Sequence, residues 1–124
     1  GSKGHKGFVS DVLRMLMEKG YRFDTGYAIG PPLMMKATAD VTKSHSLKTI
    51  VSLNPIMVDG MGMCGACRVT VGGQTKFACF EGPEFDGHQV NFDELIKRLR
   101  MYQSQEKLAS QFHEKHGGTQ LGKC

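Results

Sequence analysis

The first half of the chain alternates between helix-like and strand-like patterns of hydrophobic residues. Apolar residues recur every three or four positions over residues 8–17, which predicts a helix that ends at Gly20. A strand is predicted at 27–29, a second helix after the following prolines, and a second strand at 47–53. This order predicts parallel strands joined by crossover helices. Because two strands are too few for a complete doubly wound sheet, we expect residues 1–55 to be the back half of an α/β domain.

The middle of the chain carries the pattern of a β-hairpin. Two short alternating runs, residues 68–71 and 74–77, are separated only by the Gly-Gly pair 72–73. A two-residue glycine loop between alternating runs is a strong hairpin signal. Pairing the residues outward from this turn places Cys67 and Cys79 side by side at the open end of the hairpin.

The last third of the chain has a helical pattern that is interrupted once. Asn91 and Glu94 have the spacing of a capping box at a helix start. Apolar residues follow at helical spacing up to Tyr102. This pattern is interrupted over residues 103–107 and resumes over 108–112. The sequence therefore predicts either one long helix or two helical segments.

The size and composition of the chain are those of a single globular domain. It has 124 residues, of which 40% are hydrophobic and 23% charged. Its apolar runs are far shorter than the ~20 residues that a membrane span needs. The opening residues GSKGHKG also lack the apolar stretch of a signal peptide. We therefore expect a soluble, cytoplasmic protein with no membrane contact.

The net charge is modest and scattered. Sixteen basic residues stand against twelve acidic ones, which gives a formal charge of +4. No aromatic and basic stripe accompanies this excess, so we expect no nucleic-acid binding. The dense basic group and its acidic neighbours are typical of a solvated helix face: Lys97, Arg98, Arg100, Asp93 and Glu94.

Three of the four cysteines are clustered. Cys64, Cys67 and Cys79 fall within sixteen residues, and Cys124 ends the sequence. In a cytoplasmic chain such a cluster indicates a metal or redox site rather than a disulfide framework. Thiolates bind zinc or iron–sulfur clusters, and both normally take four ligands.

The fourth ligand is best supplied by Asp59. Its position gives the pattern D-x4-C-x2-C-x11-C, which matches the C-x4-C-x2-C…C spacing of plant-type [2Fe–2S] sites with aspartate in first place. Glycines on this loop let it turn tightly, and its N–H groups would face the sulfur atoms. Two other interpretations remain open. One is a small structural-zinc binding module that uses Asp59 or a histidine, and the other is a dithiol redox pair of Cys64 and Cys67.

Several methionines lie close to these motifs. Methionine more often fills irregular core space than binds a soft metal. We therefore interpret as core residues Met34, Met35, Met57, Met61 and Met63.

The stretch TIVSLNPIMVDGMGMCGACRVTVGGQTKFACFEGPEFDGHQVNFDEL, residues 49–95, resembles the C-terminal cluster region of ferredoxin–NADP reductase-type electron-transfer subunits. It is similar to dihydroorotate dehydrogenase electron-transfer subunits. It resembles more closely the small subunits of NADH-dependent ferredoxin:NADP oxidoreductase (sulfide dehydrogenase) and the gamma subunits of cytoplasmic hydrogenases. The resemblance implies a [2Fe–2S] cluster held by Asp59, Cys64, Cys67 and Cys79. The sequence departs from the dihydroorotate dehydrogenase subunits at the first ligand, which is Asp59 here and a cysteine in that group.

The resemblance also covers the front of the chain. The run YAIGPPLMM is similar to the family's Gly-Pro motif near the nicotinamide, which implies cofactor contacts by Gly30, Pro31 and Pro32. In the family, an FAD-binding barrel and the first βαβ unit of the NAD(P) domain precede this point. The implied division is the C-terminal half of an NAD(P)-binding reductase domain at 1–55, a cluster-binding subdomain at 56–90, and a helical segment and tail at 91–124.

The function implied by the resemblance is electron transfer within a flavin and iron–sulfur oxidoreductase. In the intact protein, electrons would pass from NAD(P)H through FAD to the cluster and then to a partner. The expected partner is a large flavin/iron–sulfur or hydrogenase subunit, with ferredoxin as a further candidate. As a fragment, the isolated chain is expected to be inactive as a dehydrogenase.

Overall fold

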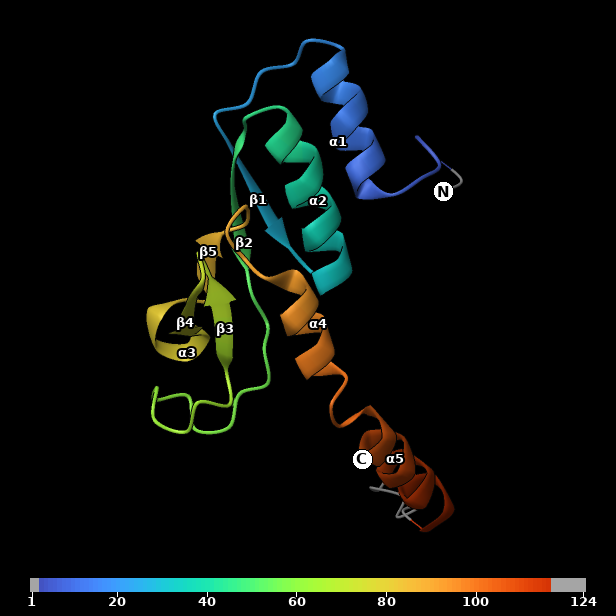
Figure 1. The fold of residues 1–124 in the computed structure, drawn as a ribbon. Helices are drawn as coiled ribbons and strands as arrows, with labels where there is room; N and C mark the ends of the chain where they lie inside the picture. Colours follow the sequence, from blue (N-terminus) through green and yellow to red (C-terminus); the bar gives the residue numbers. More distant parts are fainter. Residues whose placement is uncertain (1–2, 117–124) are drawn as a thin grey trace, which may run out of the picture.

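The computed structural model describes residues 3–116, which form two small β-sheets and five helices (Figure 1). Cys124 lies outside the described residues. The elements follow in the order α1 (Val9–Glu18), β1 (Thr25–Ile29), α2 (Pro32–Ser44), β2 (Lys48–Ser52), β3 (Arg68–Val71), β4 (Gln74–Phe77), α3 (Ala78–Glu81), β5 (Glu84–Asp86), α4 (Phe92–Leu99) and α5 (Gln103–His116).

The first sheet is mixed and has the strand order β1-β2-β5. Strands β1 and β2 are parallel, as predicted, with Ala28 opposite Val51. The sequence did not reveal β5, which pairs antiparallel to β2 and places Phe85 opposite Val51. Only three residues long, β5 has no periodicity of its own and forms because β2 offers an edge. The fold is thus a small α/β arrangement with a mixed sheet and a C-terminal helical segment.

The second sheet is the predicted hairpin of β3 and β4. Val71 pairs with Gln74 and Arg68 with Phe77, in the predicted register. The intervening Gly72 has φ +59°, a left-handed conformation that suits a glycine in a hairpin turn. The chain then passes directly into α3, a single helical turn that the sequence pattern did not predict.

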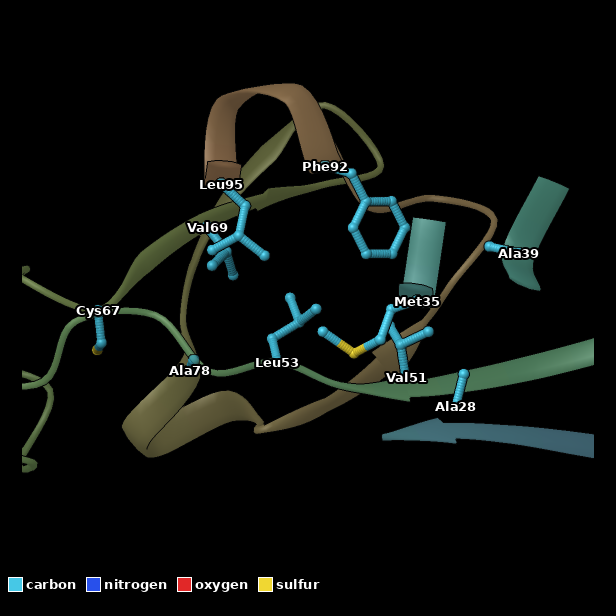
Figure 2. Packing of buried hydrophobic residues seen from close by; sticks show 10 residues of the cluster. All are labelled: Ala28, Met35, Ala39, Val51, Leu53, Cys67, Val69, Ala78, Phe92 and Leu95. Atoms are coloured by element: carbon cyan, nitrogen blue, oxygen red, sulfur yellow. The ribbon is translucent and has the colours of Figure 1, made fainter. Parts of the chain in front are cut away.

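One hydrophobic core joins the two sheets. Helix α2 covers the mixed sheet and buries Met35 completely against Val51. Figure 2 shows how Leu53 continues this core toward Val69 and Leu95 of the hairpin and α4. The remaining members are Ala28, Ala39, Cys67, Ala78 and Phe92. A metal-ligand candidate, Cys67, therefore sits at one end of the core.

Helix α4 begins at the predicted Asn91 cap, with one difference. The Asn91 side chain accepts a hydrogen bond from the Glu94 N–H at 3.1 Å. The Glu94 carboxylate does not return to the cap, since it accepts a 2.6 Å hydrogen bond from Thr70 on β3. The helix is thereby fixed to the hairpin.

The C-terminal helical pattern forms two segments. Helix α4 ends at Leu99, and α5 starts at Gln103 and points away from the sheets (Figure 1). Both Leu108 and Phe112 of α5 are exposed. Within residues 3–116, no helix has the length and apolarity to cross a membrane.

Candidate metal centre

The loop of residues 59–67, here called the ligand loop, is shaped by glycines. Gly60, Gly62 and Gly65 all have positive φ, at +71°, +79° and +66°. Side chains other than glycine rarely adopt this conformation. A Cβ on Gly62 would also lie 3.2 Å from Cβ of Phe80 on α3. The glycines therefore allow the tight, close-packed path that the sequence predicted.

Asp59 closes the first half of the ligand loop. Its Oδ1 accepts a 3.0 Å hydrogen bond from the Met61 N–H, and its Oδ2 accepts a 2.9 Å hydrogen bond from the Cys64 N–H. The hydrogen bond from Met61 is the main reason that the pKa of Asp59 lies below its ordinary value, and Cys64 adds to the effect. Asp59 is thus an ionised carboxylate placed beside Cys64.

Cys67 and Cys79 form a second pair, as predicted. Their Sγ atoms lie 3.2 Å apart and hydrogen bond, and both thiols are free. Only 2% of Cys67 is exposed. The pair is held by the hairpin and by the first turn of α3, where the Ala78 N–H donates to the Cys67 carbonyl at 3.2 Å.

Backbone amides favour a thiolate at Cys67. Burial raises the pKa of Cys67, but hydrogen bonds from the backbone and thiol of Cys79 outweigh burial, so the pKa lies below its ordinary value. The hydrogen bond to Cys67, together with burial, raises the pKa of Cys79. The lowered pKa therefore favours the thiolate form of Cys67. Such a thiolate is the form of cysteine that binds metals.

The four predicted ligands thus lie as two neighbouring pairs, Asp59 with Cys64 and Cys67 with Cys79. The Gly62 N–H donates to the Cys79 sulfur, so the ligand loop connects the pairs. Among the residues that the structure describes, no three His, Cys, Asp or Glu side chains converge as ligands of one ion.

Exposed apolar side chains surround the ligand loop. The interpretation of the nearby methionines as core residues holds for the fully buried Met35 and is wrong for Met57, Met61 and Met63, which are 48%, 68% and 81% exposed. Met61 and Met63 lie on the ligand loop, and Met57 lies two residues before it. Phe80 of α3 is likewise 78% exposed. An apolar rim therefore adjoins the exposed Cys64.

Gly30, Pro31 and Pro32 occupy the junction between β1 and α2. Met34 and Met35 donate their N–H groups to the Pro31 carbonyl and so start the helix. A Cβ on Gly30 would lie 2.5 Å from Cε of Met34. An apolar cavity of about 590 Å³ adjoins this junction, and its lining includes Pro31 but no residue of the ligand loop. The junction and the ligand loop are thus separate features of the chain.

Arg98 of α4 contacts the ligand loop, so its interpretation as part of a solvated face is wrong. The basic group on α4 was interpreted as a solvated helix face, but Arg98 is half-buried. Its Nη2 donates to the carbonyl of Ala66, in the ligand loop, at 3.0 Å. This contact spans 32 residues, so no local pattern could have indicated it.

The ligand loop lies within a region of the chain that matches a known protein family. Residues 54–91 match the family described as the iron-sulfur cluster binding domain of dihydroorotate dehydrogenase B. An uncharacterized protein of Clostridium beijerinckii is 54% identical over 120 residues, which are 96% of this chain and 40% of that protein. The dihydroorotate dehydrogenase B (NAD(+)) electron transfer subunit homolog of Thermotoga maritima is 53% identical over 109 residues, covering 88% of this chain and 38% of that protein.

A solved structure is similar over nearly the same range. It is described as the NADH-dependent reduced ferredoxin-NADP oxidoreductase, studied for flavin-based electron bifurcation. The match has a TM-score of 0.82 and 52% sequence identity, and covers 90% of this chain and 40% of that one. The present chain therefore spans about 40% of the length of these relatives.

Proposed function

We propose, from the premise that this chain is related to the ferredoxin–NADP reductase-type electron-transfer subunits and carries their iron–sulfur binding region, that it holds a [2Fe–2S] cluster. The proposed ligands are Asp59, Cys64, Cys67 and Cys79. The cluster would relay electrons between an NAD(P)H-reduced FAD and a partner subunit. The observation that carries the proposal is the grouping of these four residues into two pairs: the Asp59 carboxylate accepts from the Cys64 N–H, and the sulfur atoms of Cys67 and Cys79 hydrogen bond to each other.

The donor set fits the proposed group. Each iron of a [2Fe–2S] cluster takes two protein ligands, which corresponds to one pair of side chains per iron. Three thiols and one carboxylate supply the four anionic donors. The amides of Ala66 and Gly62 donate to the sulfur atoms of Cys64 and Cys79. Such amides stabilise the negative charge of a ligated cluster.

When bound, the group supplies one-electron transfer between donors and acceptors that do not meet directly. The chain's residues set its surroundings. Buried Cys67 and the adjoining core exclude water on one side, while exposed Cys64 leaves the other side accessible. The apolar rim with Met61, Met63 and Phe80 supports docking of a partner on that accessible side.

The names of the relatives, which describe electron transfer subunits, support a larger assembly. We propose a large flavin/iron–sulfur or hydrogenase subunit as partner, with ferredoxin as an additional candidate acceptor. Gly30, Pro31 and Pro32 lie at the carboxyl end of parallel strand β1, where α/β sheets bind cofactors, which supports a nicotinamide contact in the intact protein. We also propose that the chain divides into three parts, with boundaries after residues 55 and 90. The present portion alone is proposed to be inactive as a dehydrogenase.

A structural zinc site is the second candidate. Zinc in structural sites takes four ligands around one point. The separation of the ligands into two pairs, with no three converging within residues 3–116, counts against this candidate. A dithiol of Cys64 and Cys67 is disfavoured as well, because the thiol paired with Cys67 is Cys79.

Replacing Asp59 tests the proposed ligand set. The wild type, Asp59→Ala, Asp59→Cys and the control Asp24→Ala would be reconstituted anaerobically with iron and sulfide. Visible absorption and the electron paramagnetic resonance (EPR) spectrum of the dithionite-reduced protein would then be recorded. We expect loss of the cluster in Asp59→Ala, a cluster with an altered spectrum in Asp59→Cys, and no change in Asp24→Ala. An unaltered spectrum in both Asp59 variants would exclude Asp59 as a ligand.

A further inference from the structure

Two arginines hold consecutive carbonyl groups of the ligand loop. The Gly65 carbonyl accepts a 3.0 Å hydrogen bond from Nη1 of Arg68. The Ala66 carbonyl accepts a 3.0 Å hydrogen bond from Nη2 of Arg98. Arg68 starts strand β3, whereas Arg98 reaches the loop from helix α4. Two neighbouring peptide groups are therefore each fixed by a guanidinium.

The amide end of the first of these peptide groups points at a proposed ligand sulfur. The Gly65 carbonyl shares its peptide group with the Ala66 N–H, which donates to Sγ of Cys64 at 3.4 Å. The Ala66 carbonyl shares its peptide group with the N–H of Cys67, whose buried side chain is another proposed ligand. Arg68 thus acts on a peptide group that donates to a ligand sulfur, and Arg98 acts on the peptide group that leads into Cys67.

Hydrogen bonds at the two ends of one peptide group strengthen each other. A charged donor at the carbonyl polarises the group, so its N–H becomes a stronger donor. Hydrogen bonds to the sulfur atoms and nearby positive charge both favour the more negative, reduced state of an iron–sulfur site, which raises its potential. Arg68 supplies both effects, and Arg98 places its positive charge at the next peptide group of the ligand loop.

We propose that Arg68 and Arg98 are positioning residues that raise the reduction potential of the metal centre through the peptide groups of Gly65–Ala66 and Ala66–Cys67. The inference rests on the proposed function. The reaction concerned is a one-electron reduction, with dithionite as the donor in the test below. The electron adds to the iron–sulfur group, and no bond is formed or broken at the two arginines.

The fixation of Arg98 distinguishes it from the other cations of α4. Its helix is anchored by Phe92 and Leu95, which are 5% and 2% exposed in the core. The guanidinium is therefore preorganised at the loop. Lys97, one residue earlier on α4, carries the same charge but is exposed, which makes it a matched control.

The test is a redox titration of the anaerobically reconstituted 124-residue chain, with the EPR signal as the readout. The variants are Arg98→Gln, Arg68→Gln, the charge-retaining Arg98→Lys and the control Lys97→Gln. For Arg98→Gln and Arg68→Gln we expect the equilibrium constant for reduction to fall about tenfold, which is about 59 mV for a one-electron couple. Iron and sulfide contents should stay at the wild-type level. Arg98→Lys should recover part of the shift, and Lys97→Gln should shift the potential much less.

Three outcomes would overturn the inference. They are an unchanged potential in loaded Arg98→Gln and Arg68→Gln, an equal shift in Lys97→Gln, or an Arg98→Lys potential equal to that of Arg98→Gln. Failure of the wild type to take up iron and sulfide would instead overturn the proposed function.

A second measurement applies to variants that do not take up iron and sulfide. In the metal-free chain, nuclear magnetic resonance (NMR) should show an upfield shift of the Cys67 amide proton in Arg98→Gln and of the Ala66 amide proton in Arg68→Gln. Unchanged amide shifts would contradict the polarisation and overturn the inference.

Discussion

Leu95 connects helix α4 to the shared core, and its truncation gives the clearest prediction about stability. The side chain is 2% exposed and belongs to the core cluster that includes Leu53 and Val69 (Figure 2). Leu95→Ala removes three carbon atoms, each worth about 0.8 kcal/mol of burial, and leaves a cavity that adds to the loss. We expect the free energy of unfolding to fall by about 3 kcal/mol.

The loss should be visible in thermal and urea unfolding followed by circular dichroism. For a domain of this size, about 3 kcal/mol lowers Tm by roughly 10 °C or more. Leu108→Ala is the matched control, because Leu108 is 69% exposed on α5 and its truncation should change stability by less than about 0.5 kcal/mol. A loss below about 1 kcal/mol for Leu95→Ala, or equal losses for the two variants, would refute the shared core.

Three further predictions concern the cap, the hairpin turn and a surface ion pair. Asn91→Ala should lower stability by about 1 kcal/mol in urea unfolding, because the Glu94 N–H loses its acceptor; no change would refute the cap. Gly72→Val should destabilise the hairpin, since φ is +59° and a Cβ would lie 2.7 Å from Oε1 of Gln89; NMR cross-strand contacts that persist at unchanged Tm would contradict this. The hydrogen bond to Asp93 raises the pKa of Lys36, so this ion pair stabilises the fold at neutral pH. Its contribution should disappear as pH rises through that raised pKa, and in Asp93→Asn the pH dependence should be absent from unfolding curves measured at alkaline pH.

Local patterns predicted the features that depend on neighbouring residues. The hairpin register follows from the Gly-Gly turn, since only two residues separate strands of matching alternation. The Asn91 cap is equally local. The side-by-side position of Cys67 and Cys79 followed from that register, so this cysteine pair was predictable before any tertiary contact was known.

Features that depend on distant contacts were not predictable. Strand β5 is too short to show a periodicity and exists because β2 supplies hydrogen bonds. Arg98 looked like one cation among several on a solvated face, and only the packing of α4 on the hairpin brings it to Ala66. The exposed Met63 could not be distinguished from the buried Met35 by residue type. Whether a methionine is buried depends on whether another segment of the chain packs over it.

Metal analysis of anaerobically purified and reconstituted protein decides whether the chain holds a [2Fe–2S] cluster. Iron, acid-labile sulfide and zinc would be determined together with the visible absorption spectrum. We expect two iron and two sulfide per chain, as a [2Fe–2S] cluster requires, with red-brown colour and no stoichiometric zinc. One zinc per chain, with no sulfide even after reconstitution with iron and sulfide, would contradict this expectation.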